Sequence, residues 1–212
     1  MSRQNKSTHL RRYTDIPFLL DYLRTKELVL LSPKMWDDKN DRHCLESYAR
    51  ASRFDSIYAL CLTEASETYH HWKVFTSGSS GVCIEFKKDD LIRFAEKVSS
   101  LRAEPVQYQT IKELKIKRPT LEQLPFLKRN AFKDESEFRL FVANNNPSCE
   151  PLRFHVPASA VNRVILSPWI SDVVAKQVIA TLNKIKGCKT LKVKRSLLID
   201  NESWKQLAEI GT

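Results

Sequence analysis

The apolar residues of this chain follow a helical period in some segments and a strand-like pattern in others. Residues 16–26 show the helical period, with Asp15 or Thr14 as the cap and Pro17 in the first turn. Residues 57–63 are apolar almost throughout, which is typical of a buried strand, and the polar end at Thr63 is where a site could begin. Further helices are expected over residues 45–53, 69–75, 91–101, 121–130 and 171–182. Further strands are expected near residue 10 and over residues 27–31, 82–86, 106–108, 132–141, 152–156, 161–166 and 190–194.

Short strands separated by helices of this length predict an α+β fold. We expect residues 1–212 to form a single α+β domain, in which helices pack on a mixed, mostly antiparallel sheet of about eight short strands. A chain of this length buries roughly 70% of its unfolded surface, so one hydrophobic core is sufficient.

The composition excludes several classes of protein. The 4 glycines of the sequence leave no material for a glycine-rich loop that cradles phosphates. No apolar run approaches the roughly 20 residues that cross a bilayer, so we expect no membrane partner. The first residues are polar and do not form the apolar core of a signal peptide. We therefore expect a cytoplasmic protein.

The cysteines and histidines do not suggest a metal site. The 5 cysteines are odd in number and widely spaced, so we interpret them as reduced thiols. None of them lies two to four residues from another, as zinc ligands commonly do. His70 and His71 are adjacent and point in different directions on a helix or a strand. The sequence therefore predicts no bound metal.

The charge balance favours a polyanionic partner. The sequence has 35 basic and 25 acidic residues, a formal net charge of +10. Such an excess raises the local concentration of nucleic acid, which is the partner that we expect, although a dispersed surplus also occurs on ordinary solvated surfaces. The excess is concentrated near the N-terminus (Arg3, Lys6, Arg11, Arg12), over residues 112–129 and over residues 184–195.

The segment from Phe132 to Phe141 contains the pattern Glu-x-Glu-x-Arg. On a strand, Glu135, Glu137 and Arg139 share one face, while the other face is apolar enough to pack on a core. The arginine can keep one carboxylate ionised and oriented, while the second carboxylate, next to a like charge, becomes available for a hydroxyl group or a proton. The alternative is a salt-bridged face on an ordinary strand.

Several segments in the same order resemble a bacterial family of domains of unknown function, number 2971, which is found among phage-defence and abortive-infection genes. The turn at residues 36–41 departs from the family pattern, because Lys39 stands in place of proline. The resemblance implies a toxin or defence effector, with an antitoxin or defence-system protein as a partner. It rests on residues 10–13, 36–41, 61–64, 71–75, 81–86, 133–139 and 161–168.

The layout also resembles, more distantly, the ADP-ribosyltransferase superfamily. It shares an early strand with a basic and an aromatic residue, a middle strand that ends in Ser or Thr, an aromatic helix and a late strand with Glu-x-Glu. The resemblance implies an enzyme that uses NAD, with Glu137 as the catalytic carboxylate and Glu135 activating the incoming nucleophile. A carboxylate near a developing cation in a dry pocket is what cleavage of this glycosidic bond needs.

The same resemblance assigns the NAD-binding residues. Arg12 contacts the pyrophosphate or ribose, Thr63 supports the site, and the candidate stacking surfaces are Tyr13, Trp72 and Phe75. Each assignment has a structural alternative, since Arg12 can pair with an acidic neighbour and aromatic residues at helical spacing often belong to the core.

Three functions compete. The first is an ADP-ribosyltransferase-like effector that modifies nucleic acid or a protein bound to it; the second is a non-catalytic nucleic-acid-binding or regulatory module. The third is a metal-dependent nuclease with Glu135, Glu137 and Asp41 as ligands. The enzyme hypothesis requires that Arg12, Glu137 and an aromatic residue of segment 69–75 converge on one pocket, and that Arg12 lies beside the strand that carries Glu137.

Overall fold

A computed structural model of the protein describes residues 7–146 and 150–209. The strands are β1 (His9–Asp15), β2 (Glu27–Leu30), β3 (Ser56–Thr63), β4 (Gly81–Lys87), β5 (Arg102–Pro105), β6 (Gln107–Gln109), β7 (Leu127–Arg129), β8 (Glu137–Asn144), β9 (Leu152–His155), β10 (Val161–Leu166) and β11 (Val193–Arg195). The helices are α1 (Ile16–Thr25), α2 (Lys39–Ser52), α3 (Tyr69–Phe75), α4 (Lys88–Ala95), α5 (Ile111–Ile116), α6 (Asp172–Asn183) and α7 (Glu202–Ala208). Short 3₁₀ helices include η3 (Leu121–Phe126) and η4 (Asn130–Glu135).

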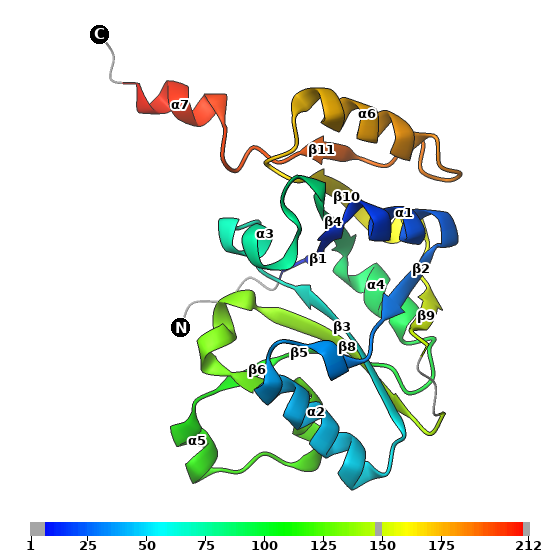
Figure 1. Cartoon of the computed structure of the whole chain (residues 1–212), viewed down its shortest axis with the longest axis vertical. Coiled ribbons are helices and arrows are strands. Elements are labelled where there is room, and N and C mark those ends of the chain that lie inside the picture. Colours follow the sequence, from blue (N-terminus) through cyan, green and yellow to red (C-terminus); the bar gives the residue numbers. More distant parts are fainter. Residues whose placement is uncertain (1–6, 147–149, 210–212) are drawn as a thin grey trace.

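Seven strands form the main sheet in the order β11-β10-β4-β1-β3-β8-β5 (Figure 1). Its neighbouring strands are antiparallel except for the parallel pair β10 and β11. Two small sheets, β2-β9 and β6-β7, complete the fold. The predicted α+β class with a mixed, mostly antiparallel sheet is therefore confirmed.

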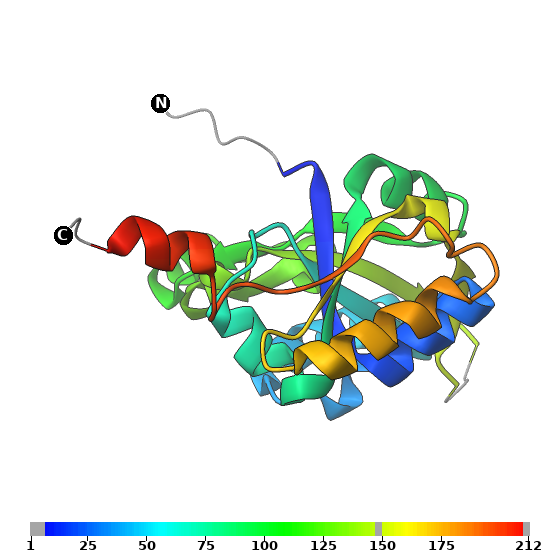
Figure 2. The same ribbon diagram turned by 90° about the horizontal axis from the view of Figure 1, so that it is seen from above.

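The alternation of side chains along the strands divides the sheet into two faces. On one face, residues such as Leu60, Ile84 and Leu140 form the main core together with α1, α4 and α6. Helices α1 and α6 lie side by side in both views (Figures 1 and 2). Burial of this apolar surface is the main source of stability.

The other face of the sheet carries two smaller apolar clusters. Helix α2 packs on β3 and β8, where Leu45 contacts the cluster around Phe141. Helix α3 contributes Trp72 to a second cluster with Cys83 and Ile165, on β4 and β10. The part of the sheet between these two clusters is polar, and the candidate site lies there.

The sequence prediction was wrong at two places that matter for the site. The helix expected over residues 121–130 is instead η3 followed by strand β7. Pro125 lies inside η3 and removes a backbone donor, which is incompatible with a continued α-helix. The strand expected from residue 132 begins only at Glu137, because Ser136 adopts a left-handed conformation with φ 45°.

Outside the sheet, the C-terminal α7 extends away from the body of the molecule (Figures 1 and 2). The expected final strand is present as β11, shifted to Val193–Arg195. Among the described residues, no helix has the length and apolar character needed to cross a membrane.

Candidate active site

A cavity of about 470 Å³ opens between α2, α3 and η4 on the polar part of the sheet. Residues from β1, β3 and β8 form its floor, and α2, α3 and η4 form its walls. Its lining residues are Arg11, Tyr13, Trp36, Asp37, Asp38, Asp41, Cys61, Leu62, Thr63, His71, Val74, Phe75, Lys128, Phe132, Glu135 and Glu137. Five of the residues assigned from sequence therefore meet here, namely Tyr13, Thr63, Phe75, Glu135 and Glu137.

Arg139 is the buried centre of the charged network beside the cavity and is 0% exposed. Its Nε donates to Glu137 Oε1 at 2.7 Å, and its two terminal nitrogens bind Asp41 Oδ1 and Oδ2 at 2.9 and 2.7 Å. Nη1 also donates to the carbonyl of Pro125 at 2.8 Å. The prediction that Arg139 orients a glutamate is confirmed, but this face of the strand is buried and is not an exposed salt-bridged surface.

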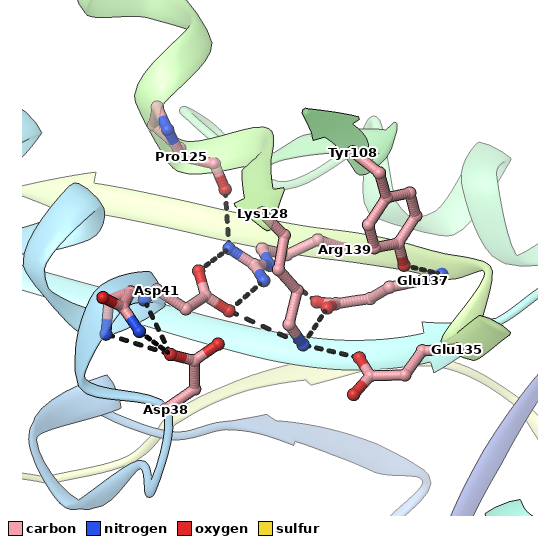
Figure 3. A network of polar contacts seen from close by, with 9 residues as sticks. Asp38, Asp41, Tyr108, Pro125, Lys128, Glu135, Glu137 and Arg139 are labelled. Atoms are coloured by element: carbon pink, nitrogen blue, oxygen red, sulfur yellow. Dashed lines mark hydrogen bonds and ion pairs between the residues drawn. The ribbon is translucent and has the colours of Figure 1, made fainter. Parts of the chain in front are cut away.

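Lys128 joins three carboxylates from the cavity side (Figure 3). Its ammonium lies 2.5 Å from Glu135 Oε2, 3.1 Å from Glu137 Oε2 and 3.8 Å from Asp41 Oδ2. Although burial opposes it, attraction to Glu137 and Glu135 raises the pKa of Lys128. Lys128 is therefore charged at neutral pH, and its side chain occupies the position between the three carboxylates.

The two glutamates of the pattern have opposite pKa shifts. Burial raises the pKa of Glu137, but attraction to Arg139 and Lys128 outweighs it and lowers the value to about 2. Burial, together with repulsion from Glu137, raises the pKa of Glu135 in spite of its bond to Lys128. The two carboxylates therefore differ: Glu137 stays ionised, and Glu135 is closer to accepting a proton.

Glu135 reaches this network from η4 and not from β8. The left-handed turn at Ser136 brings the carboxylate of Glu135 toward Lys128. Three contacts hold the backbone carbonyl of Glu135 and the adjoining loop. Thr63 Oγ1 donates to the Glu135 carbonyl at 2.5 Å, and His71 Nε2 lies 3.4 Å from the same oxygen. The Ser136 carbonyl accepts from the Glu64 N–H at 2.9 Å. Thr63 therefore supports the site through the backbone.

Aromatic rings form one wall of the cavity. Tyr13 stacks on His71 with centroids 5.3 Å apart, and Phe75 follows at 5.9 Å from His71. Burial lowers the pKa of His71, so its imidazole is neutral at neutral pH. Phe75 is 41% exposed and lines the cavity.

Trp72 does not line the cavity, contrary to the sequence assignment. It is 0% exposed, packs in the core with Cys83 and Ile165, and donates its ring N–H to Glu67 Oε1 at 2.8 Å. The physical reason is helical spacing, because His71, Val74 and Phe75 are spaced i, i+3 and i+4 and share the face of α3 that lines the cavity. Trp72 lies beside this face and packs on the sheet.

Arg12 also lies outside the cavity, and its expected position was wrong. Strand β3 separates β1 from β8, so Arg12 is not beside the strand that carries Glu137. Along β1, Arg12 alternates with Arg11 and Tyr13 and shares the face of Leu10, which belongs to the main core. Burial lowers the pKa of Arg12 to about 10, and attraction to the carboxylate of Asp21 in α1 opposes this shift. Only Glu137 and Phe75 meet in the cavity, so the enzyme hypothesis fails in the form expected from the sequence, with Arg12 as the ligand of the pyrophosphate or ribose.

Arg11 lines the cavity in place of Arg12, but its charge is already paired. Its Nε and Nη2 lie 2.9 and 2.8 Å from Glu85 Oε2, and Nη1 donates to the carbonyl of Ala65 at 2.7 Å. Strand alternation alone predicts that Arg11, and not Arg12, lies at the cavity with Tyr13, since Arg11 and Tyr13 are two residues apart and share a face.

The cavity has an excess of negative charge. Five carboxylates line it (Asp37, Asp38, Asp41, Glu135 and Glu137), against the two cationic side chains Arg11 and Lys128. Outside the lining, Arg139 compensates Asp41 and Glu137, and Glu85 compensates Arg11. Asp38 caps α2 through Oδ1, whereas its Oδ2 is buried without a hydrogen-bond partner. This oxygen has almost no accessible surface, so Asp38 contributes to the cavity through its charge and not through a free acceptor atom.

Several of these residues could not be identified from the sequence. Lys128 lies 7 residues before Glu135, in a segment that the sequence predicts to be helical. Asp38 caps α2, but the sequence predicts that this helix begins only at residue 45. Cys61 lines the cavity and is exposed to it, but desolvation by the cavity walls and the nearby Glu137 raise the pKa of its thiol, so it is not a thiolate nucleophile at neutral pH.

One protein family matches part of the chain. The sequence model of the family described as "Protein of unknown function (DUF2971)" matches residues 71–140. This segment runs from α3 to the start of β8 and contains Lys128, Glu135, Glu137 and Arg139, whereas Asp38 and Asp41 lie before it. A comparison with curated proteins gave no match.

Proposed function

We propose that the cavity binds the nicotinamide riboside end of NAD and that the protein cleaves its glycosidic bond, as an ADP-ribosyltransferase-like enzyme. The observation that carries the proposal is the excess of carboxylates in an aromatic cavity. The nicotinamide ring of NAD is a cation, and the ribose becomes an oxocarbenium-like cation when the bond breaks. Fixed negative charge beside such a centre stabilises the transition state.

The bond between the ribose and the ring nitrogen breaks, and its electron pair leaves with nicotinamide. The ribosyl cation is then attacked by a nucleophile, which loses its proton to a base. Glu135 is suited to this role, because only its Oε2 is bonded to Lys128 and no partner of Oε1 is found among the described residues. Its raised pKa brings it closer to the range in which a base is effective.

Glu137 has a different role from the one implied by the resemblance. Both of its oxygens accept from cations, Oε1 from Arg139 and Oε2 from Lys128, and its side chain is 3% exposed. Its charge is therefore largely compensated. We assign Glu137 to positioning Lys128 and, through it, Glu135, and we place Glu135 next to the substrate.

The aromatic wall and Asp38 complete the proposed binding mode. Phe75 offers its ring face to nicotinamide, because a pyridinium is attracted to an aromatic face. Asp38 adds a further negative charge at the cavity wall. Because Arg11 is paired with Glu85, we place only the riboside end in the cavity and the pyrophosphate outside it.

The position of Lys128 argues against the nuclease alternative. Its ammonium already lies between Glu135, Glu137 and Asp41, where a catalytic metal ion would have to bind. Two of these carboxylates are also bonded to Arg139. A toxin or defence role in the cytoplasm, with an antitoxin or defence-system protein as a partner, remains part of the proposal, since enzymes that consume NAD suit such a role.

The direct test is to incubate the purified full-length protein with NAD, with and without nucleic acid and protein acceptors. The release of nicotinamide is measured by chromatography. We expect release above the uncatalysed rate with at least one acceptor or with water. Glu27→Gln is the matched control, because it removes an exposed carboxylate far from the cavity and is expected to leave the rate unchanged. Absence of release under all these conditions would contradict the proposal.

A further inference from the structure

A second cavity, of about 480 Å³, adjoins the first one. It lies between the start of α2, strands β6 and β7, and α5. Asp41 and Lys128 line both cavities, so the two meet at this pair. Its lining residues are Lys39, Asn40, Asp41, His43, Cys44, Gln109, Ile111, Leu114, Leu127, Lys128 and Arg129.

The free charges of the second cavity are opposite to those of the first. Its one carboxylate, Asp41, is engaged by both terminal nitrogens of Arg139. Lys39 and Arg129 are exposed, and neither makes an ion pair with any residue in ranges 7–146 and 150–209. The second cavity therefore favours an anion, next to a first cavity that favours a cation.

The cationic surface continues from this cavity onto α5. Exposed basic residues without an ion pair in the described part of the chain follow along and after this helix, at Lys112, Lys115, Lys117 and Arg118. Glu113, the acidic residue of α5, is bonded to Thr110 at the start of the helix. An extended row of free cations that leads to a cavity matches a chain of phosphates better than a single small anion.

The apolar part of the second cavity indicates what accompanies the phosphates. Ile111, which is 59% exposed, lines it together with Leu114 and Leu127. Asn40, Gln109 and His43 add hydrogen-bonding groups at the same place. A flat ring with polar edges fits this combination, and such a ring enters a cavity only when it is not stacked in a duplex.

We propose that the second cavity is the acceptor site and that it binds single-stranded nucleic acid. Lys39 and Arg129 contact phosphates, a base lies against Ile111, and the reactive group lies at the wall formed by Asp41 and Lys128. The catalytic part of this inference rests on the proposed function, whereas the binding part does not. The proposal assigns the basic residues at the α5 end of the molecule to the binding of phosphates.

The second basic segment, residues 184–195, provides the control. It lies around the end of α6 and β11, at the opposite end of the molecule from α5 (Figure 1). Lys186 and Lys189 are exposed there, as Lys39 and Arg129 are at the acceptor site. Lys186→Gln/Lys189→Gln therefore removes the same charge as Lys39→Gln/Arg129→Gln without touching the cavity.

The experiment is fluorescence anisotropy of a labelled single strand of about 12 nucleotides, without NAD, over a range of salt concentrations. We expect Lys39→Gln/Arg129→Gln to raise the dissociation constant by about tenfold or more at low salt and to reduce the salt slope by about 1.4. Ile111→Ser is expected to weaken binding about threefold at every salt concentration, because it removes an apolar contact. The control pair is expected to change binding less than about twofold.

The inference is overturned if Lys39→Gln/Arg129→Gln and the control pair Lys186→Gln/Lys189→Gln lose the same affinity for the strand. It is also overturned if the duplex of the same sequence binds more tightly, or if the strand does not bind at low salt. Binding of an acidic protein in place of the single strand would overturn it as well. Circular dichroism and thermal melting establish that the variants are folded. If nicotinamide is released but the strand does not bind, the acceptor site alone is wrong. If the strand binds as expected but no nicotinamide is released, the proposed function alone is wrong.

Discussion

Glu135→Gln is expected to lower kcat for nicotinamide release by a factor of about 10²–10³ and to leave the dissociation constant of NAD within about threefold. The amide keeps the shape of the side chain and its contact with Lys128 but can no longer accept a proton. A group that acts on the reacting atoms lowers kcat more than it changes binding of the substrate. The measurement is steady-state kinetics together with calorimetry on the same protein.

The pH dependence gives a second readout of the same variant. Burial raises the pKa of Glu135, so the wild-type rate is expected to fall as the pH drops through a value above the ordinary glutamate pKa of about 4.3. Glu135→Gln is expected to lose this acid limb. The assignment of Glu135 fails if the folded variant keeps the wild-type kcat, while Glu27→Gln serves again as the exposed control.

Arg139→Leu is expected to lower the free energy of unfolding by about 3–5 kcal/mol at neutral pH, because it leaves two buried carboxylates without their main partner. Leucine fills much of the space of the alkyl chain, so the loss is one of charge pairing and not of volume. The measurement is a urea titration. Arg153→Leu is the control, since its pair with Asp21 is half exposed and contributes less than about 1 kcal/mol.

The lowered pKa of Glu137 decides how the free energy of unfolding changes with pH. Its folded value of about 2 lies below the unfolded value of about 4.3, so this group stabilises the fold above that unfolded value. The contribution is lost as the pH falls from about 4.3 toward 2. Arg139→Leu removes much of the depression, so the difference between variant and wild type is expected to narrow over this range. A constant difference, or a loss no larger than that of Arg153→Leu, would contradict the account.

The sequence was most informative where strand alternation decides the outcome. Continuous apolar runs predicted the buried strands β3, β4 and β10, and the period of two predicted the shared face of Glu137 and Arg139. The same rule places Arg12 and Tyr13 on opposite faces of β1, which makes Arg11 and not Arg12 the partner of Tyr13.

The features of the site that the sequence did not predict depend on backbone turns and on contacts between distant residues. Because of the left-handed conformation of Ser136, the strand begins at Glu137 and not at Glu135, as the Glu-x-Glu pattern suggests, and serine carries no strong preference for this conformation. Lys128 joins the site because Pro125 breaks the expected helix and a strand follows. Asp41 is 98 residues from Arg139, so their pairing depends on how α2 packs across β3 and β8.

The acidic character of the first cavity is the central claim, and affinity for a ligand pair that differs in one charge tests it most directly. NAD and NADH differ in the ring, which is a cation in NAD and neutral in NADH. Calorimetry is expected to give NAD a dissociation constant about tenfold lower than that of NADH, a difference of about 1.4 kcal/mol, and Glu135→Gln is expected to reduce this ratio. Equal affinities, or tighter binding of NADH, would contradict the claim.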